Sequence, residues 1–202
     1  MKPLLIREEL LNRKIRIFSN QEFSQIFKLS QYQAEFALNR LIKEGLLIRI
    51  KKGYYVLKID PPCEEEIANA LYKPSYVSFE YALAYYGIIP EVTYQITSAT
   101  TKSTRLFIVN NIAYSYYTIK AEAYTGYILA QREEKRFYIA EPEKALVDYL
   151  YIVSLKQRVT PGRRSLNDRI ELSSINKNKV HSYTKLYNWS NLNELVEEVL
   201  KP

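Results

Sequence analysis

Residues Ser19 to Leu57 carry, in order, the signals of a capped helix, a turn, a second capped helix and a basic hairpin. Ser19 stands three residues before Glu22, and Ser30 stands three residues before Gln33. At this spacing the serine and the later side chain each accept a backbone N–H of the first helical turn, so each serine predicts a helix start. This order of elements indicates a winged helix-turn-helix.

The apolar spacing gives the expected bounds of these elements. We predict helices over residues 4–14, 20–27 and 31–44, and strands over residues 46–50 and 54–58. Gly45 supplies the left-handed residue that ends the third helix. The strands flank Lys51-Lys52-Gly53, so the hairpin has a basic tip. A winged fold places such a tip over a phosphate backbone.

The positive charge of the chain is concentrated in the same segment. The first sixty residues hold 12 cations and 6 anions, which accounts for +6 of the total formal charge of +7. The other 142 residues hold 17 cations and 16 anions and are nearly neutral. A basic domain with a fold that presents charge is typical of a nucleic-acid-binding protein, although a merely solvated basic face is the alternative.

The predicted DNA contacts come from the second helix of the motif and from the hairpin. They are Gln31, Tyr32, Gln33, Asn39, Arg40, Lys43, Arg49, Lys51 and Lys52. Glutamine pairs with adenine through two hydrogen bonds, and lysine reaches guanine or phosphate in the major groove. The alternatives are a protein-binding winged helix with a solvated helix face, and wing cations that only increase solubility.

A second domain is expected after Asp60-Pro61-Pro62, because paired prolines stop both strand and helix. We therefore predict a winged-helix domain over residues 1–60 and a C-terminal domain over residues 61–202. The predicted strands of the second domain are 94–98, 104–109, 112–119, 124–130 and 136–139, and its predicted helices are 64–71, 79–86, 141–155, 177–187 and 192–200. The expected fold class is α+β, with a small antiparallel sheet and covering helices.

The composition gives no sign of catalysis or of a cofactor. One cysteine, Cys63, excludes an internal disulfide, and one histidine, His181, makes a metal site improbable. Glu141 and Glu143 fit the favourable placement of acids at a helix N-terminus, and no nucleophile or metal motif accompanies them. We expect a non-enzymatic protein with no metal and no cofactor.

The expected location is the cytoplasm. No apolar run is long enough to cross a bilayer, and residues 1–9 contain charges too early for a signal peptide. We therefore expect no membrane association. A further basic segment over residues 157–169, with Arg158, Arg163, Arg164 and Arg169, is predicted to be an exposed loop whose role stays open.

Several segments resemble the AbiEi-like antitoxins of type IV toxin-antitoxin and abortive-infection systems. They are residues 45–55, residues 76–90, residues 97–107 and residues 140–148, in that order. The resemblance implies a winged helix that binds the promoter of its own operon and represses it. It also implies a C-terminal antitoxin domain that neutralises a nucleotidyltransferase-like toxin encoded beside it. Periodicity and composition support only the DNA-binding half.

The residues leave other functions and properties open. A winged-helix transcriptional regulator whose second domain senses a small ligand through some of the 19 tyrosines is the main alternative. The operator sequence and the need for direct contact with the toxin are not defined by the residues. The oligomeric state is also open, and a monomer that binds DNA repeats cooperatively is one expectation.

Overall fold

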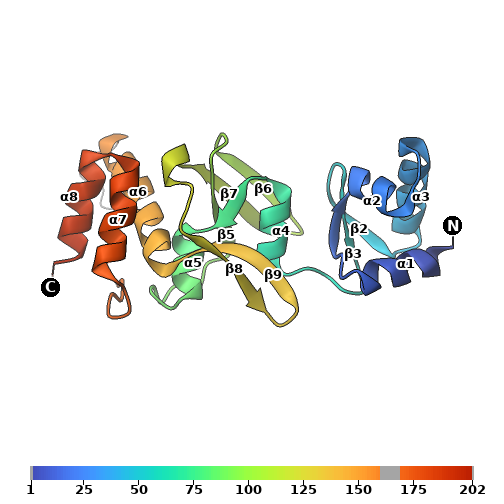
Figure 1. The fold of residues 1–202 in the computed structure, drawn as a ribbon, viewed down its shortest axis with the longest axis horizontal. Helices are drawn as coiled ribbons and strands as arrows, with labels where there is room; N and C mark the ends of the chain where they lie inside the picture. The colour runs from blue at the N-terminus through green and yellow to red at the C-terminus, as the bar shows by residue number, and fades with distance from the viewer. Residues whose placement is uncertain (1, 160–168, 202) are drawn as a thin grey trace. The chain divides into compact units, whose positions relative to one another are not determined.

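The computed structural model describes residues 2–159 and 169–201, which divide into two compact units, residues 1–71 and residues 72–202. Figure 1 shows the winged helix of the first unit and the sheet and helices of the second. The α+β class and the winged helix agree with the expectation from the sequence. The structural division falls at Leu71, whereas the proline pair had suggested residue 60.

The first unit is a winged helix with one more helix after the wing. Its elements are α1 (Pro3–Asn12), β1 (Ile17–Ser19), α2 (Asn20–Phe27), α3 (Gln31–Lys43), β2 (Leu47–Lys51), β3 (Tyr54–Leu57) and α4 (Glu64–Leu71). The three strands pair antiparallel in the order β1-β3-β2. The strand β1 was missed in the sequence because three residues are too short to show an alternating pattern.

Both predicted capping boxes are present. The amide of Glu22 donates to the Ser19 hydroxyl at 3.1 Å, and the amide of Gln33 donates to the Ser30 hydroxyl at 3.3 Å. The reciprocal bonds to the Glu22 and Gln33 side chains are also formed. These caps satisfy backbone donors that a helix start leaves free, so they fix where α2 and α3 begin. Gly45, at φ +74°, follows the end of α3.

An apolar core joins the helices of the first unit to its strands. It consists of Ile6, Leu10, Phe18, Phe23, Ala34, Leu38, Leu41, Leu47, Tyr55 and Leu57, all buried. Phe18 stacks between Phe23 and Tyr55, with ring centroids 5.6 and 6.2 Å away. Because Ala34, Leu38 and Leu41 face this core, the opposite side of α3 is presented to solvent.

The second unit is built on a six-stranded mixed sheet. Its elements are β4 (Ser75–Val77), α5 (Phe79–Tyr85), β5 (Gln95–Thr100), β6 (Arg105–Val109), β7 (Ile112–Thr118), the 3₁₀ turn η1 (Ala121–Ala123), β8 (Tyr127–Arg132), β9 (Lys135–Ala140), α6 (Pro142–Val159), α7 (Lys177–Tyr187) and α8 (Ser190–Val199). The strand order is β6-β7-β5-β4-β9-β8. Asn110 and Asn111 form a tight turn between β6 and β7, since both residues have positive φ and Val109 pairs with Ile112.

The pairing in this sheet differs from the purely antiparallel arrangement expected from the sequence. The pairs β5–β7 and β4–β9 are parallel, and the other three pairs are antiparallel. Two features of the strand order account for this. The strand β4, which has three residues and is too short to recognise, inserts between β5 and β9, and β6 lies outside β7, so β5 pairs with β7. Helix α5 packs on β5, while α6 packs on α5, α7 and α8.

Candidate nucleic-acid interface

Helix α3 exposes every side chain that the sequence singled out on it. Gln31, Tyr32, Gln33, Asn39, Arg40 and Lys43 are all exposed. Tyr32, Phe36, Asn39 and Lys43 follow one another at offsets of four, seven and eleven residues, which places them along one face of a helix. Tyr32 and Phe36 are 80% and 68% exposed, so large aromatic rings occupy the N-terminal half of this face.

The predicted contact residues differ in how free their polar groups are. The Gln33 carbonyl oxygen accepts the Ser30 amide at 3.0 Å, and the Arg40 guanidinium contacts the Glu44 carboxylate at 2.8 Å. Pairing of Gln33 with adenine through two bonds requires that oxygen, so it would break the capping box. Gln31, Asn39 and Lys43 form no side-chain bond with another described residue, which leaves them free to bind bases.

A polar hollow lies beside the start of α3. Asn20, Gln21, Ser24 and Gln31 line a space of about 290 Å³. It lies between α2 and the start of α3, and all four of its lining side chains are polar. Gln31 therefore borders a polar hollow.

The wing presents two of its three predicted cations to solvent. Arg49 and Lys52 are exposed, whereas Lys51 is half-buried. The Lys51 ammonium donates to the Leu71 carbonyl oxygen at 2.9 Å and lies 5.7 Å from the centroid of the Tyr54 ring. Lys52, in the turn with Gly53, is therefore better placed than Lys51 to contact a phosphate.

Extending the first unit from residue 60 to Leu71 lowers its net positive charge. Helix α4 adds Glu64, Glu65 and Glu66, so residues 1–71 carry 12 cations and 9 anions. Arg16 and Asp60 pair at 2.8 Å, with only 9% of the Arg16 side chain exposed. The excess of positive charge is thus smaller than for residues 1–60. The exposed cations include Arg40 and Lys43 on α3 and Arg49 and Lys52 on the wing, and others lie elsewhere on the unit.

An aromatic hollow beside α3 was not foreseen from the sequence. Ile6, Leu29, Tyr32, Gln33, Phe36, Ala37, Arg40 and Leu41 line a space of about 270 Å³. Leu29 in the turn and Ile6 on α1 come together with α3 through tertiary packing, which no local pattern reveals. The sequence does show two aromatic residues, Tyr32 and Phe36, four positions apart on the predicted helix, and this spacing was the available sign of an aromatic surface.

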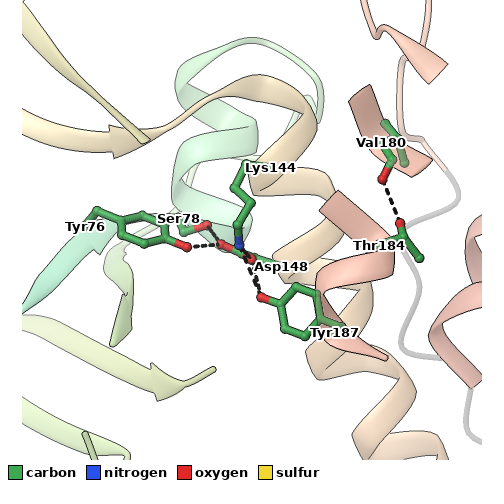
Figure 2. A network of polar contacts seen from close by, with 7 residues as sticks. All are labelled: Tyr76, Ser78, Lys144, Asp148, Val180, Thr184 and Tyr187. Atoms are coloured by element: carbon green, nitrogen blue, oxygen red, sulfur yellow. Dashed lines mark hydrogen bonds and ion pairs between the residues drawn. The ribbon is translucent and has the colours of Figure 1, made fainter. Parts of the chain in front are cut away.

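The second unit contains a buried polar cluster, shown in Figure 2. The Lys144 ammonium pairs with the Asp148 carboxylate one helical turn away, and both side chains are fully buried. Tyr76 and Ser78 donate to the same carboxylate at 3.0 and 2.7 Å, and Tyr187 also donates to it. The cluster therefore joins β4 and the start of α5 to α6 and α7.

This cluster engages the residue before α5 and shifts several pKa values. Ser78 stands at the N-cap position of α5, but its hydroxyl donates to Asp148 and makes no cap bond. Burial lowers the pKa of Lys144, an effect that the nearby Asp148 charge opposes. Burial raises the pKa values of Tyr76 and Tyr187 well above the usual value. These are the properties of a sealed structural network.

The acids at the start of α6 also have structural partners. Glu141 accepts hydrogen bonds from Tyr183 at 2.6 Å and from Lys179 at 3.1 Å. The bond from Tyr183 is the main reason that the pKa of Glu141 is lowered. Glu143 accepts the amide of Asn176 at 3.1 Å. Within the described residues, no group of three acidic, histidine or cysteine side chains is arranged to hold a metal ion.

The predicted basic loop is described only in part. Residues 157–159 belong to the backbone of α6, and Arg163 and Arg164 lie outside the described residues. Arg169 forms an ion pair with Glu91. Among the helices of the described chain, none is long and apolar enough to cross a membrane.

The three-helix core, the strand order β1-β3-β2 and the exposed α3 define a winged-helix domain of the kind found in transcriptional regulators. Residues 5–58 match the family model described as "Transcriptional regulator, AbiEi antitoxin". The N-terminal unit is therefore similar to this family over residues 5–58, and the resemblance is confirmed over that range. Residues 76–90, 97–107 and 140–148, which also suggested the family, lie beyond the match. A comparison of the chain with curated proteins finds no match.

Proposed function

We propose that the chain is a DNA-binding repressor and antitoxin that regulates its own operon and neutralises a nucleotidyltransferase-like toxin encoded beside it. The observation that carries this proposal is the open face of α3, where Gln31, Asn39 and Lys43 are exposed and free, on a winged helix that matches the AbiEi antitoxin regulators. The site of action is the cytoplasm, where operator DNA and the toxin are both accessible.

The DNA-binding part rests on the division of roles between helix and wing. In winged and helix-turn-helix proteins the second helix of the motif enters the major groove, where side chains distinguish base pairs. Gln31 lies at the start of α3, and Asn39 and Lys43 follow on its exposed face. Arg49 and Lys52 on the wing supply phosphate contacts, which set the position on the duplex and carry no sequence information.

The antitoxin part rests on the family description and on the second unit. Residues 72–202 have their own sheet, helices and buried core, as an independently folded domain does. We assign DNA binding to the first unit and neutralisation to the second, with the boundary between residue 60 and Leu71. The toxin is a functional partner, and neutralisation by direct contact and neutralisation at the toxin's target are both compatible with this assignment.

One experiment in cells tests both parts. The chain is expressed with the neighbouring gene product, and growth is scored together with a reporter driven by the operon's own promoter. We expect growth to be rescued and the reporter to be repressed. A triple variant with alanine at Gln31, Asn39 and Lys43 should lose repression and keep rescue. Loss of both functions in a variant that remains folded, or no rescue by the wild type, would contradict the proposal.

A further inference from the structure

The N-terminal half of the exposed face of α3 is aromatic where a base-reading helix would ordinarily be polar. Tyr32 and Phe36 lie one turn apart and are 80% and 68% exposed. Adjacent large apolar side chains on a soluble surface mark an interaction site more often than chance exposure does. The proposed DNA-binding face thus contains two rings whose binding role has not been defined.

Several polar side chains near these rings are already engaged or have the wrong charge. The Gln33 oxygen accepts the Ser30 amide, and Arg40 pairs with Glu44. Glu35 is exposed and anionic, so phosphate oxygens would repel it. Hydrogen-bonding readout is therefore available through Gln31, Asn39 and Lys43, while Tyr32 and Phe36 offer apolar contact between Gln31 and Asn39.

The rings also border a concave apolar surface. Tyr32 and Phe36 line the 270 Å³ hollow together with Leu29, Ala37 and Leu41. An apolar group that enters beside Phe36 meets several side chains at once and loses its contact with water. In the major groove of DNA, the C5 methyl of thymine is the one apolar group that a base pair presents.

We infer that Phe36, assisted by Tyr32, is a specificity-determining residue that recognises thymine in the operator by burying its C5 methyl group. This inference rests on the proposed function, since it requires α3 in the major groove. The charge pattern favours DNA over a second copy of the chain as the occupant. Lys43, Arg49 and Lys52 are exposed on this unit, so a polyanion is complementary and an identical basic surface is repelled.

The size of the effect follows from the area of one methyl group. Burying one methylene contributes about 0.8 kcal/mol, which corresponds to a change of roughly fourfold in the dissociation constant. Removing a single contacted methyl from the operator should therefore weaken binding about threefold to fivefold. Removing a methyl that α3 does not contact should have no effect.

The test uses the full chain and a fluorescent duplex of its own promoter. Each thymine in turn is replaced by deoxyuridine, which removes the C5 methyl and keeps every hydrogen-bonding group. Binding is measured by anisotropy for the wild type and for Phe36→Ala. Phe36 is mostly exposed, so this variant should fold, which a thermal melt checks. Tyr94→Ala is the matched control, because Tyr94 is 90% exposed and lies in the second unit.

For the wild type and for Tyr94→Ala, we expect affinity to fall threefold to fivefold when deoxyuridine replaces thymine at one or more positions. At those positions Phe36→Ala should bind the thymine and deoxyuridine duplexes equally. Wild-type binding that is selective for the promoter but unaffected by every deoxyuridine would overturn this inference alone. So would methyl discrimination that persists in Phe36→Ala, or a change of oligomeric mass in that variant with unchanged discrimination. Absence of any preference for the promoter over a scrambled duplex would overturn the proposed function as well.

Discussion

The buried Lys144–Asp148 pair gives a sharp prediction about the stability of the second unit. Three hydroxyl groups, from Tyr76, Ser78 and Tyr187, donate to the Asp148 carboxylate in addition to the ammonium of Lys144. In Lys144→Met the carboxylate keeps those three donors. In Asp148→Ala all three hydroxyls lose their acceptor at once, and the ammonium loses its charged partner and keeps only the Tyr187 hydroxyl oxygen, 3.3 Å away, as an acceptor. The two variants should therefore differ.

The magnitudes follow from the number of groups left unsatisfied. Breaking a buried ion pair typically costs about 3–5 kcal/mol, and we expect about 3 kcal/mol for Lys144→Met because hydroxyl donors still solvate the carboxylate. In Asp148→Ala, Lys144 can avoid a buried unpaired charge by losing its proton. For a lysine of ordinary pKa this costs about 4.6 kcal/mol at pH 7, which is the upper limit of the charge penalty. Each orphaned hydroxyl adds about 1 kcal/mol or more. The total of about 6–8 kcal/mol is comparable to the stability of a whole domain.

The assay is urea unfolding followed by tryptophan fluorescence. The single tryptophan, Trp189, lies in the second unit, so its signal reports that unit. Lys179→Met is the control, because Lys179 pairs with Glu141 at the surface and its loss should shift the midpoint little. The reasoning would be refuted if Lys144→Met lowered the free energy of unfolding as much as Asp148→Ala or more. It would also be refuted if either variant lowered that free energy by less than about 1 kcal/mol.

Four further predictions concern the interface, the pH dependence and the division into units. Lys52→Ala should lower the slope of log affinity against log salt by about 0.9 on every duplex, and Lys185→Ala in the second unit should not. Gln31→Ala should weaken the free energy of binding to the promoter by about 1–3 kcal/mol and leave binding to random DNA unchanged. An equal loss of affinity for both would show that Gln31 does not read bases. Burial raises the pKa of Tyr86 to about 12, so the unfolded chain releases its proton first and stability should fall as pH rises above about 10, measured by absorbance at 295 nm during alkaline unfolding. Residues 72–202 should melt cooperatively when expressed alone, and a broad non-cooperative transition would contradict an independent core.

The local signals in the sequence predicted most of the winged helix. The capping pairs at Ser19 and Ser30 fixed the starts of α2 and α3, and Gly45 follows the end of α3 as expected. These features depend on residues within one helical turn of each other, so the chain itself displays them. The strands β1 and β4 have three residues each, which is too short for an alternating pattern.

Features that depend on distant residues were beyond local patterns. The buried Asp148 receives hydroxyl groups that β4 and α7 bring from positions 72 and 39 residues away. The engagement of Lys51 by the Leu71 carbonyl similarly requires α4 to lie near the wing tip. The i,i+4 spacing of Lys144 and Asp148 within an apolar stretch was a usable sign of a buried pair, but it did not name their partners.

The most direct test of the central claim is the affinity of the full chain for its own promoter duplex and for a scrambled duplex of equal length, measured by anisotropy at physiological salt. We predict that the wild type binds the promoter at least about 10³-fold more tightly. A triple variant with alanine at Gln31, Asn39 and Lys43 should melt like the wild type and lose that preference. Equal affinity of the wild type for the two duplexes would contradict the account.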